Sequence, residues 1–257
     1  MMFDIGKVKL PNWGELAANQ LDYYSNANRH DLICRYKLTQ IYQNFYIARM
    51  HLIYSNDKIN YGDLDKDELD KNDIQKIFLQ NSLIYYNFCI DLSWSMVYFY
   101  CLPIKSNSNI LKDEVRNAEK IVDYEFITDY LKNNSKNIVV EYQNKLKKLL
   151  KIINGFWNKI LSSEFRKMYN YTKHQGSYNL IGINIDDFMK IEGINTNIEI
   201  IKSPEFSEEI ITNELITFNN EFILYMDKII DIVIDPSNKK ELYDFNEIVG
   251  NLLKNKK

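Results

Sequence analysis

The chain has 257 residues, of which 46% are hydrophobic and 26% charged, a composition that suits one large or two small globular domains. A net charge of −3 excludes a strong overall attraction to nucleic acid, so any such contact requires a local basic patch. Only 8 glycines and 4 prolines are present, which favours long regular elements over many turns.

The cysteines and histidines favour a reducing compartment without a metal centre. Cys34, Cys89 and Cys101 are odd in number and lack the CxxC spacing of a zinc ribbon. The three histidines form no HExxH-like pair. We therefore expect a cytoplasmic protein that holds no metal and needs no cofactor.

Membrane attachment is not indicated by the sequence. Residues 1–10 lack the apolar core of a signal peptide. Residues 83–102 are the most span-like stretch, but Asn87 and Asp91 interrupt them, and a charge in mid-span is costly. The stretch predicts a buried core helix rather than a transmembrane one.

The N-terminal half is expected to be helical. A short peripheral helix over 16–25 precedes a long helix over 31–54, for which Asp31 is a suitable N-cap. The long helix has the apolar spacing of a packed helix at Cys34, Leu38, Ile41, Phe45, Ala48 and Leu52. The next helix begins at Asn72 or Asp73 and ends near Cys101. Its apolar residues cover most of the circumference, which predicts a central position.

The connection between these helices is acidic. Asp63, Asp65 and Asp67 alternate like the first ligands of a calcium loop. Glu68 stands where that loop has glycine, and Ile74 stands at the last ligand position. A solvated loop or a short helix is therefore the stronger prediction.

Further helices are predicted over 113–132 and 136–161, with a break at 133–135. The second of them has a clean apolar stripe at Val139, Tyr142, Leu146, Leu149, Ile153, Trp157 and Ile160. Its opposite face carries Lys145, Lys147, Lys148 and Lys151. Such a run is usually a solvated face, but it is also the strongest basic patch in the chain and could track a phosphate backbone.

The pattern changes after Gly176. Alternating residues over 178–185 and 196–202 predict two short strands that pair as a hairpin. Ser203 as cap and Pro204 in the first turn then predict a helix that runs to 235. Its apolar stripe is Ile211, Leu215, Phe218, Phe222, Tyr225, Ile229 and Val233. A last helix is expected over 241–253.

No internal repeat or interdomain linker is evident. The sequence predicts a mainly α fold, a multi-helix bundle with a small β-hairpin insertion near 178–202. We expect a single helical domain over 1–257 with its core at about 31–235. Residues 1–28 and 239–257 are expected to be peripheral.

One polar and aromatic stretch, residues 165–176, is the best candidate for chemistry. On a helix Arg166, Asn170 and His174 share one side, and Lys167 lies seven residues before His174. An imidazole beside a cation and an amide can move a proton and hold a phosphate. The alternative is that Lys173 and His174 only place cations near a helix C-terminus, where they suit the dipole.

Asp91 is the unusual residue of the apolar helix that ends at Cys101. Hydroxyls or a cation from a neighbouring helix would satisfy its carboxylate. The functional alternative is that Asp91 supports the site by orienting Arg166, Lys167 and His174.

The segment Tyr-Asn-Tyr-Thr-Lys-His-Gln-Gly, late in a helical chain, resembles the motif region of the HEPN superfamily, the higher eukaryotes and prokaryotes nucleotide-binding domains. That motif is an arginine, often followed by a polar residue, and then a histidine after four to six intervening residues. His174 matches the histidine and Asn170 the polar residue, while Tyr169 stands in the arginine position. Lys167 has six intervening residues before His174 and could stand in as the cation.

The resemblance implies a HEPN-type helical bundle that forms homodimers and binds RNA or a nucleotide. It implies a metal-independent endoribonuclease of a defence or toxin–antitoxin system, in which His174 acts as general base or acid. Lys167 or Arg166 would stabilise the charge that builds on the phosphate. The alternative is an inactive helical module that binds a nucleotide or a partner protein.

Overall fold

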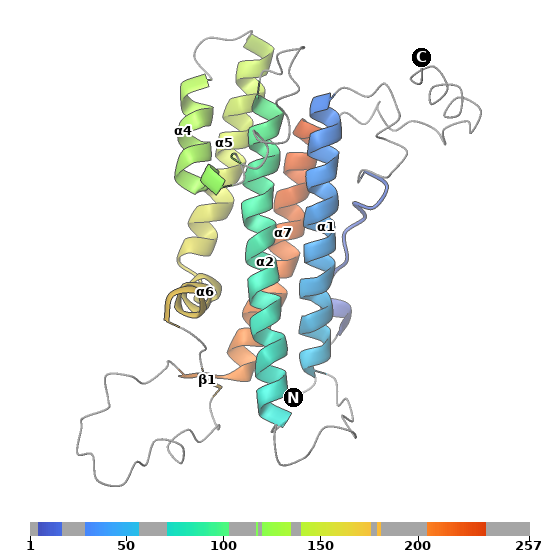
Figure 1. Ribbon diagram of the computed structural model, residues 1–257, viewed down its shortest axis with the longest axis vertical. Coiled ribbons are helices and arrows are strands. Elements are labelled where there is room, and N and C mark those ends of the chain that lie inside the picture. Colours follow the sequence, from blue (N-terminus) through green and yellow to red (C-terminus); the bar gives the residue numbers. More distant parts are fainter. Residues whose placement is uncertain are drawn as a thin grey trace, which may run out of the picture. The chain divides into compact units, whose positions relative to one another are not determined.

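A computed structural model describes residues 5–16, 29–56, 71–102, 117, 120–134, 140–175, 179–180 and 205–234. Six α-helices account for most of these residues (Figure 1). They are α1 (Arg29–Asn56), α2 (Lys71–Cys101), α4 (Tyr124–Asn134), α5 (Val140–Leu161), α6 (Glu164–Gln175) and α7 (Glu208–Val233). A short 3-10 helix, η1 (Ile5–Lys7), precedes them. The mainly α fold class is therefore confirmed for the described part of the chain.

The long helices form where the apolar spacing predicts them. Every residue of the α1 stripe, from Cys34 to Leu52, has an exposed fraction of 0%. The α7 stripe from Ile211 to Val233 is also buried, with no residue above 5% exposed. α1 begins two residues before Asp31, so this aspartate lies inside the first turn and not at the cap. The predicted helices over 16–25 and 241–253 and the acidic segment at 63–68 lie outside the described residues, apart from Leu16 in a turn.

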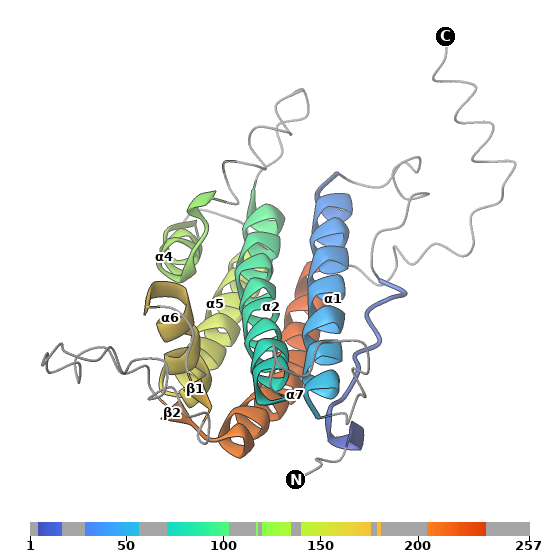
Figure 2. The same cartoon turned by 60° about the horizontal axis from the view of Figure 1, so that its bottom comes forward.

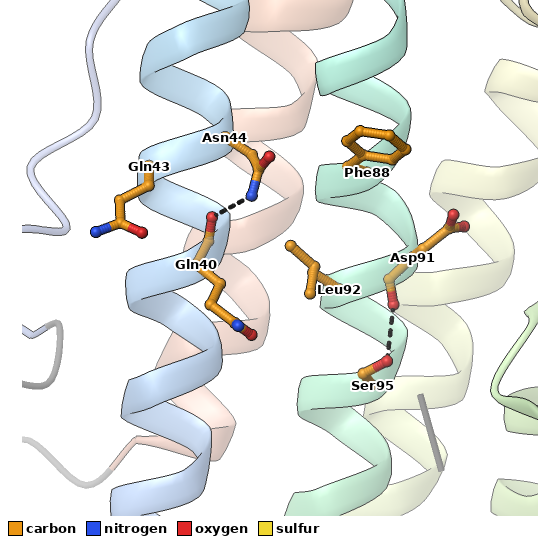
Figure 3. Close-up of a pocket in the computed structure, with 7 residues that line it drawn as sticks. All are labelled: Gln40, Gln43, Asn44, Phe88, Asp91, Leu92 and Ser95. Carbon is orange, nitrogen blue, oxygen red and sulfur yellow. Dashed lines mark hydrogen bonds between the residues drawn. The ribbon is translucent and has the colours of Figure 1, made fainter. Parts of the chain in front are cut away.

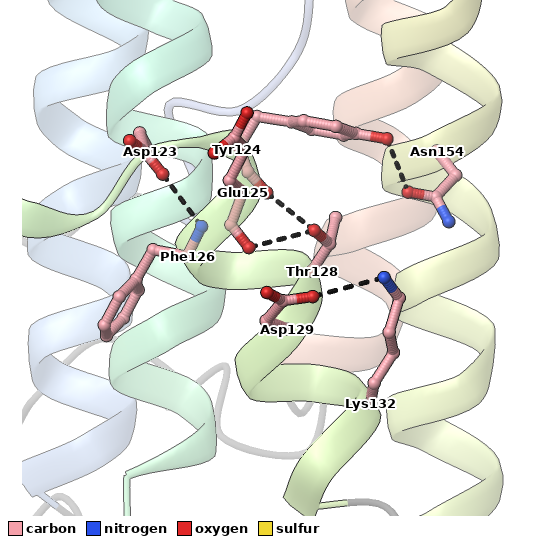
Figure 4. A network of polar contacts seen from close by, with 8 residues as sticks. All are labelled: Asp123, Tyr124, Glu125, Phe126, Thr128, Asp129, Lys132 and Asn154. Carbon is pink, nitrogen blue, oxygen red and sulfur yellow. Dashed lines mark hydrogen bonds and ion pairs between the residues drawn. The ribbon is translucent and has the colours of Figure 1, made fainter.

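The predicted helix over 113–132 is interrupted, which corrects the sequence analysis. Val122 and Asp123 are not helical, and α4 begins at Tyr124. The carboxylate of Asp123 accepts a hydrogen bond of 2.8 Å from the backbone N–H of Phe126 (Figure 4). Asp123 is thus an N-cap, which satisfies one of the amide groups that a helix start leaves unpaired.

The start of α7 is also corrected. Ser207 caps this helix through its hydroxyl, which accepts a hydrogen bond of 3.1 Å from the N–H of Ile210. Glu205 and Phe206, expected in the first turn, instead form β2 (Glu205–Phe206). The helix therefore begins after the predicted cap at Ser203, although Ser203 and Pro204 themselves lie outside the described residues.

The predicted hairpin is not confirmed. β1 (Asn179–Leu180) pairs with β2, and the pairing is parallel rather than the antiparallel pairing of a hairpin. The expected partner strand over 196–202 lies outside the described residues. The parallel bridge places residues 179–180, which come shortly after α6, beside the residues that lead into α7.

The chain divides into two compact units, and α1, α2, α5 and α7 each contribute one part to each unit. Unit 1 contains residues 1–9, 47–86 and 159–220, and unit 2 contains residues 10–46, 87–158 and 221–257. Figure 2 shows the same helices from below. None of the described helices is long and apolar enough to cross a membrane.

Aromatic side chains fill the core of unit 2. The rings of Phe156 and Tyr225 stack at 4.0 Å, and Trp94 meets Trp157 edge to face at 5.2 Å. The hydroxyl of Tyr225 lies 3.0 Å from the hydroxyl of Ser93, so its polar end is satisfied inside the core. Such pairs join burial of large apolar area to a fixed geometry, which holds α2, α5 and α7 together.

In unit 1, side-chain amides of α7 hold residues 7–9 in place. The N–H of Lys9 donates to Asn220, and the carbonyl of Lys9 accepts from the amide of Asn219. The hydroxyl of Tyr86 donates to Asn219 at 2.8 Å, and this asparagine is fully buried. The two asparagines therefore replace the backbone partners that an extended segment would find in a sheet.

Candidate functional site

α6 is an amphipathic helix whose apolar side is docked in unit 1. Phe165 and Met168 are buried, with 1% and 0% of their surface exposed. The ring of Phe165 stacks on the ring of Phe218 from α7, with 4.1 Å between the centroids and 8° between the planes. The helix is thus fixed by its buried side, which leaves its polar side to solvent.

The start of α6 is capped from another helix. Ser163 lies at the N-cap position, but its hydroxyl donates a hydrogen bond of 2.6 Å to the carbonyl of Ile160 in α5. The N–H of Phe165 instead donates to the carboxylate of Glu214 in α7, at 3.3 Å. A negative charge at a helix N-terminus also suits the helix dipole, so Glu214 supplies the cap that the Ser163 side chain does not.

The solvent side of α6 carries most of the predicted site. Lys167, Asn170 and Lys173 are all exposed. The Nζ of Lys167 lies 2.6 Å from the Oε1 of Glu164, in an ion pair between neighbouring turns. The backbone of His174 is helical and follows Asn170 by four residues, so the two positions share one face of the helix. The side chain of His174 lies outside the described part of the structure.

Arg166 and Tyr169 lie together beside this face. The guanidinium carbon of Arg166 is 5.0 Å from the ring centroid of Tyr169, which is within the range of a cation–π contact. Both side chains are half-buried. Tyr169, which stands where the HEPN motif has arginine, therefore has an arginine stacked on its ring.

Asp91 is exposed, although it lies on α2, a helix whose apolar composition predicted a central position. The neighbouring Ile90 and Trp94 are buried, while Phe88 is 43% exposed. α2 thus has one outward edge despite its apolar composition, and Asp91 lies on it. Asp91 belongs to unit 2 and the α6 residues belong to unit 1, so the suggested support of the α6 residues by Asp91 stays a prediction.

Asp91 lines a pocket between α1 and α2 in unit 2 (Figure 3). The pocket has a volume of about 450 Å³ and is lined by Gln40, Gln43, Asn44, Phe88, Asp91, Leu92 and Ser95. The amide of Asn44 donates to the backbone carbonyl of Gln40 at 2.8 Å, so the oxygen of the Asn44 side chain remains as an acceptor. A pocket lined by carboxamides and a carboxylate without a cation does not suit a phosphate group.

The sequence analysis did not identify this pocket. A signal was nevertheless present, because Gln40, Gln43 and Asn44 are spaced i, i+3 and i+4 and therefore share one face of α1. Three amide side chains on one face of a helix with a buried apolar stripe indicate an exposed strip. That strip forms one side of the pocket.

The lysine run of α5 faces solvent as expected. Lys145, Lys147, Lys148 and Lys151 are all exposed, and they belong to unit 2. Lys145 pairs loosely with Glu141, at 3.7 Å.

Metal binding receives no support from the described residues, in which no group of three or more histidines, cysteines and carboxylates lies close enough to hold an ion. Comparison with protein-family models, curated proteins and solved structures gives no match for this chain. The functional argument therefore depends on the side chains themselves.

Proposed function

We propose that the solvent side of α6 binds RNA and cleaves it without a metal ion, in the manner of a HEPN-like endoribonuclease. The observation that carries the proposal is the exposed face of α6, where Lys167, Asn170 and Lys173 accompany the helical position of His174. Cations and an amide can bind a phosphate, and an imidazole can move the proton that cleavage requires.

In the proposed reaction His174 removes the proton of a ribose 2′-hydroxyl, which attacks the adjacent phosphorus. The bond between phosphorus and the 5′-oxygen of the next nucleotide breaks, which leaves a 2′,3′-cyclic phosphate. The 5′-oxygen takes a proton from a protonated imidazole, that of His174 or of His174 in the second copy of the dimer. Lys167 or Arg166 stabilises the negative charge that develops on the phosphate oxygens.

The ion pair of Lys167 with Glu164 is compatible with this role. The Lys167 side chain is 63% exposed and that of Glu164 is 40% exposed, and pairs in such solvent-accessible places contribute little to stability. A phosphate can therefore replace Glu164 as the partner of the Lys167 ammonium group at a small cost in free energy. The Arg166 side chain is held by Tyr169 and presents a less mobile positive charge.

A homodimer is part of the proposal, since HEPN-like sites bring two copies of the motif together. Sedimentation equilibrium or light scattering measures the mass directly, and the calculated mass of one chain is 30.7 kDa. A monomer at the concentrations used for cleavage would contradict the dimer.

The test of catalysis is RNA cleavage in the presence of a chelator. We expect His174→Ala to abolish cleavage, Lys167→Ala to reduce it and Lys167→Arg to retain or raise it, because arginine holds a phosphate with two parallel hydrogen bonds. Lys132→Ala, which removes an exposed lysine of α4, is the matched control and should cleave like wild type. Unchanged cleavage by His174→Ala would remove the proposal.

A second candidate function is a binding module without catalysis. It is favoured by Tyr169 in the arginine position and by the carboxylate that already pairs with Lys167. This alternative predicts that wild type binds RNA, a nucleotide or a partner protein without cleavage. It also predicts that His174→Ala leaves that complex intact.

A further inference from the structure

α5 carries a second positively charged surface, which is distinct from the polar side of α6. Its members Lys147, Lys148 and Lys151 are exposed, and we call these three lysines the basic face of α5. α5 has one carboxylate, Glu141 in its first turn, and no acidic residue from 142 to 161. The positive charge of this helix is therefore concentrated in a chain whose net charge is −3.

Carboxylates in the described part of the chain do not neutralise the basic face. Glu141 pairs with Lys145 rather than with one of the three lysines. On α4, which contacts α5 through the Tyr124–Asn154 hydrogen bond, the exposed acids are Glu125 and Asp129, and Asp129 pairs with Lys132 (Figure 4). The three lysines form no ion pair with a described residue, so their charges are available to a ligand.

Gly155 is a second, independent observation on the same helix. It follows Lys148 by seven residues and Lys151 by four, so it lies on the side of the basic face. A Cβ atom at Gly155 would meet no atom within 4 Å, so packing does not require a glycine. Glycine in a helix interior weakens the helix, and an exposed glycine lets a ligand approach the backbone closely.

We propose that the basic face of α5, with Gly155, is a contact surface for the phosphate backbone of an RNA strand. This inference takes one premise from the proposed function, namely that the bound polyanion is RNA. Lysines provide point charges, which suit a backbone whose phosphates present no fixed bidentate geometry.

Two other kinds of partner, a membrane surface and a protein, fit this face less well. A helix that lies in a membrane surface requires an apolar side that inserts, whereas the large exposed apolar residues of α5 are only Val140 and Leu161, at its two ends. A protein interface usually has aromatic or arginine anchors at its centre, whereas this face presents lysine, asparagine and glycine. An RNA strand needs only the row of positive charges and a close approach.

The test is the salt dependence of RNA binding by the full chain, measured by fluorescence anisotropy with a labelled single-stranded RNA. The variant is Lys147→Gln/Lys148→Gln/Lys151→Gln. The matched control is Lys120→Gln/Lys132→Gln/Lys228→Gln, which removes the same charge from exposed lysines elsewhere in unit 2. We expect the magnitude of the slope of log affinity against log salt to fall by about 2 in the variant, because each of the three lost phosphate contacts contributes about 0.7 for a single strand. In the control the slope should stay near the wild-type value.

Equal slopes for the variant and the control would overturn the proposal. So would a variant that binds RNA like wild type but loses binding to vesicles of phosphatidylserine and phosphatidylcholine, since the face would then contact membranes. For Gly155, we expect Gly155→Gln to weaken RNA binding without a change of slope, while Gly155→Ala raises Tm. If Gly155→Gln binds RNA with wild-type affinity, the strand does not approach the helix backbone closely at this residue, and that part of the proposal is wrong.

Single-turnover cleavage separates this inference from the proposed function. If both hold, the lysine variant needs more RNA for half-maximal cleavage but reaches the wild-type rate at saturation. If wild type binds RNA through the basic face and does not cleave it, the inference stands and the proposed catalysis fails. If wild type cleaves RNA and the lysine variant matches it at every RNA concentration, the inference fails and the catalysis stands.

Discussion

At the residue scale, His51 is a half-buried imidazole beside two aromatic rings in unit 1. Its ring stacks on Tyr85 at 5.8 Å and lies 5.5 Å from the ring of Phe78. The Nδ1 atom is buried and has no hydrogen-bond partner among the described residues. Burial lowers the pKa of His51 from its ordinary value, because partial removal from water disfavours the charged form.

This lowered pKa predicts a loss of stability in mild acid. Above the unfolded pKa of about 6.5 both states hold a neutral imidazole, so the full stability is present. As the pH falls below that value, the unfolded chain binds a proton more readily than the folded chain, and the free energy of unfolding decreases. We expect His51→Phe to reduce the fall in urea midpoint between neutral pH and about pH 5. His174→Gln is the control, and a fall in His51→Phe as large as in wild type would contradict the prediction.

Two tyrosine hydroxyls satisfy the carbonyl groups at the end of α2 in unit 2. Tyr142 of α5 donates to the carbonyl of Tyr100, and Tyr130 of α4 donates to the carbonyl of Cys101, each at 3.3 Å. Burial raises the pKa of Tyr130 to about 12 and that of Tyr142 further, so both hydroxyls keep their protons at neutral pH. The last carbonyls of a helix have no partner within it, and these tyrosines supply one.

Removal of the Tyr142 hydroxyl should therefore cost stability. We expect Tyr142→Phe to lower the free energy of unfolding by about 1 kcal/mol, the usual contribution of one hydrogen bond. Denaturant unfolding at neutral pH measures the loss. Tyr36→Phe on an exposed part of α1 is the matched control. A midpoint for Tyr142→Phe equal to that of the control would show that water replaces the hydroxyl.

The site residues could be predicted from the sequence only as positions on a helix. The spacing of Lys167, Asn170 and His174 places them on one face once residues 164–175 are helical, and this helix is confirmed. The pairing of Lys167 with Glu164 follows from the same spacing, although the sequence analysis did not use it. The exposure of Asp91 depends on which neighbours pack on α2, and a periodic pattern in one helix does not contain that information.

At the scale of elements, the helices were predictable and several of their boundaries were not. Apolar stripes identify α1, α5 and α7 because burial repeats with the helical period. The breaks at Asp123 and Ser207 depend on a single capping hydrogen bond, and other residues nearby offer similar caps. The cap of α6 comes from Glu214, 49 residues after the amide group that it binds, so local sequence could not reveal it.

The cap by Glu214 makes a prediction about the helix that carries the proposed site. We expect Glu214→Ala to lower stability by about 1 kcal/mol, as loss of an N-cap does, and Glu214→Gln to lose less because an acceptor remains. Hydrogen exchange of the first amides of α6 should accelerate in Glu214→Ala. Glu221→Ala, a half-buried glutamate of α7 at the start of its part in unit 2, is the control. Unchanged exchange in α6 would mean that Glu214 does not hold its N-terminus.

At the scale of the whole molecule, the single domain predicted over 1–257 remains a prediction, and the two compact units give it a testable form. Four helices pass from one unit to the other without a break, at residues 46–47, 86–87, 158–159 and 220–221. A helix is cooperative along its length, because each residue that unwinds also releases hydrogen bonds of its neighbours. Unfolding of one unit would therefore leave four helix ends exposed in the other.

We accordingly expect the two units to unfold in a single transition. All three tryptophans, Trp13, Trp94 and Trp157, belong to unit 2, so their fluorescence reports on that unit alone, while far-ultraviolet circular dichroism reports on every helix. Asn219→Ala destabilises unit 1, because it leaves the buried hydroxyl of Tyr86 and the carbonyl of Lys9 without their partner, at a cost of about 1–3 kcal/mol. If the units are coupled, this substitution lowers the midpoint seen by tryptophan fluorescence as much as the midpoint seen by circular dichroism. A fluorescence midpoint that stays at the wild-type value while the circular dichroism midpoint falls would show that the units unfold independently.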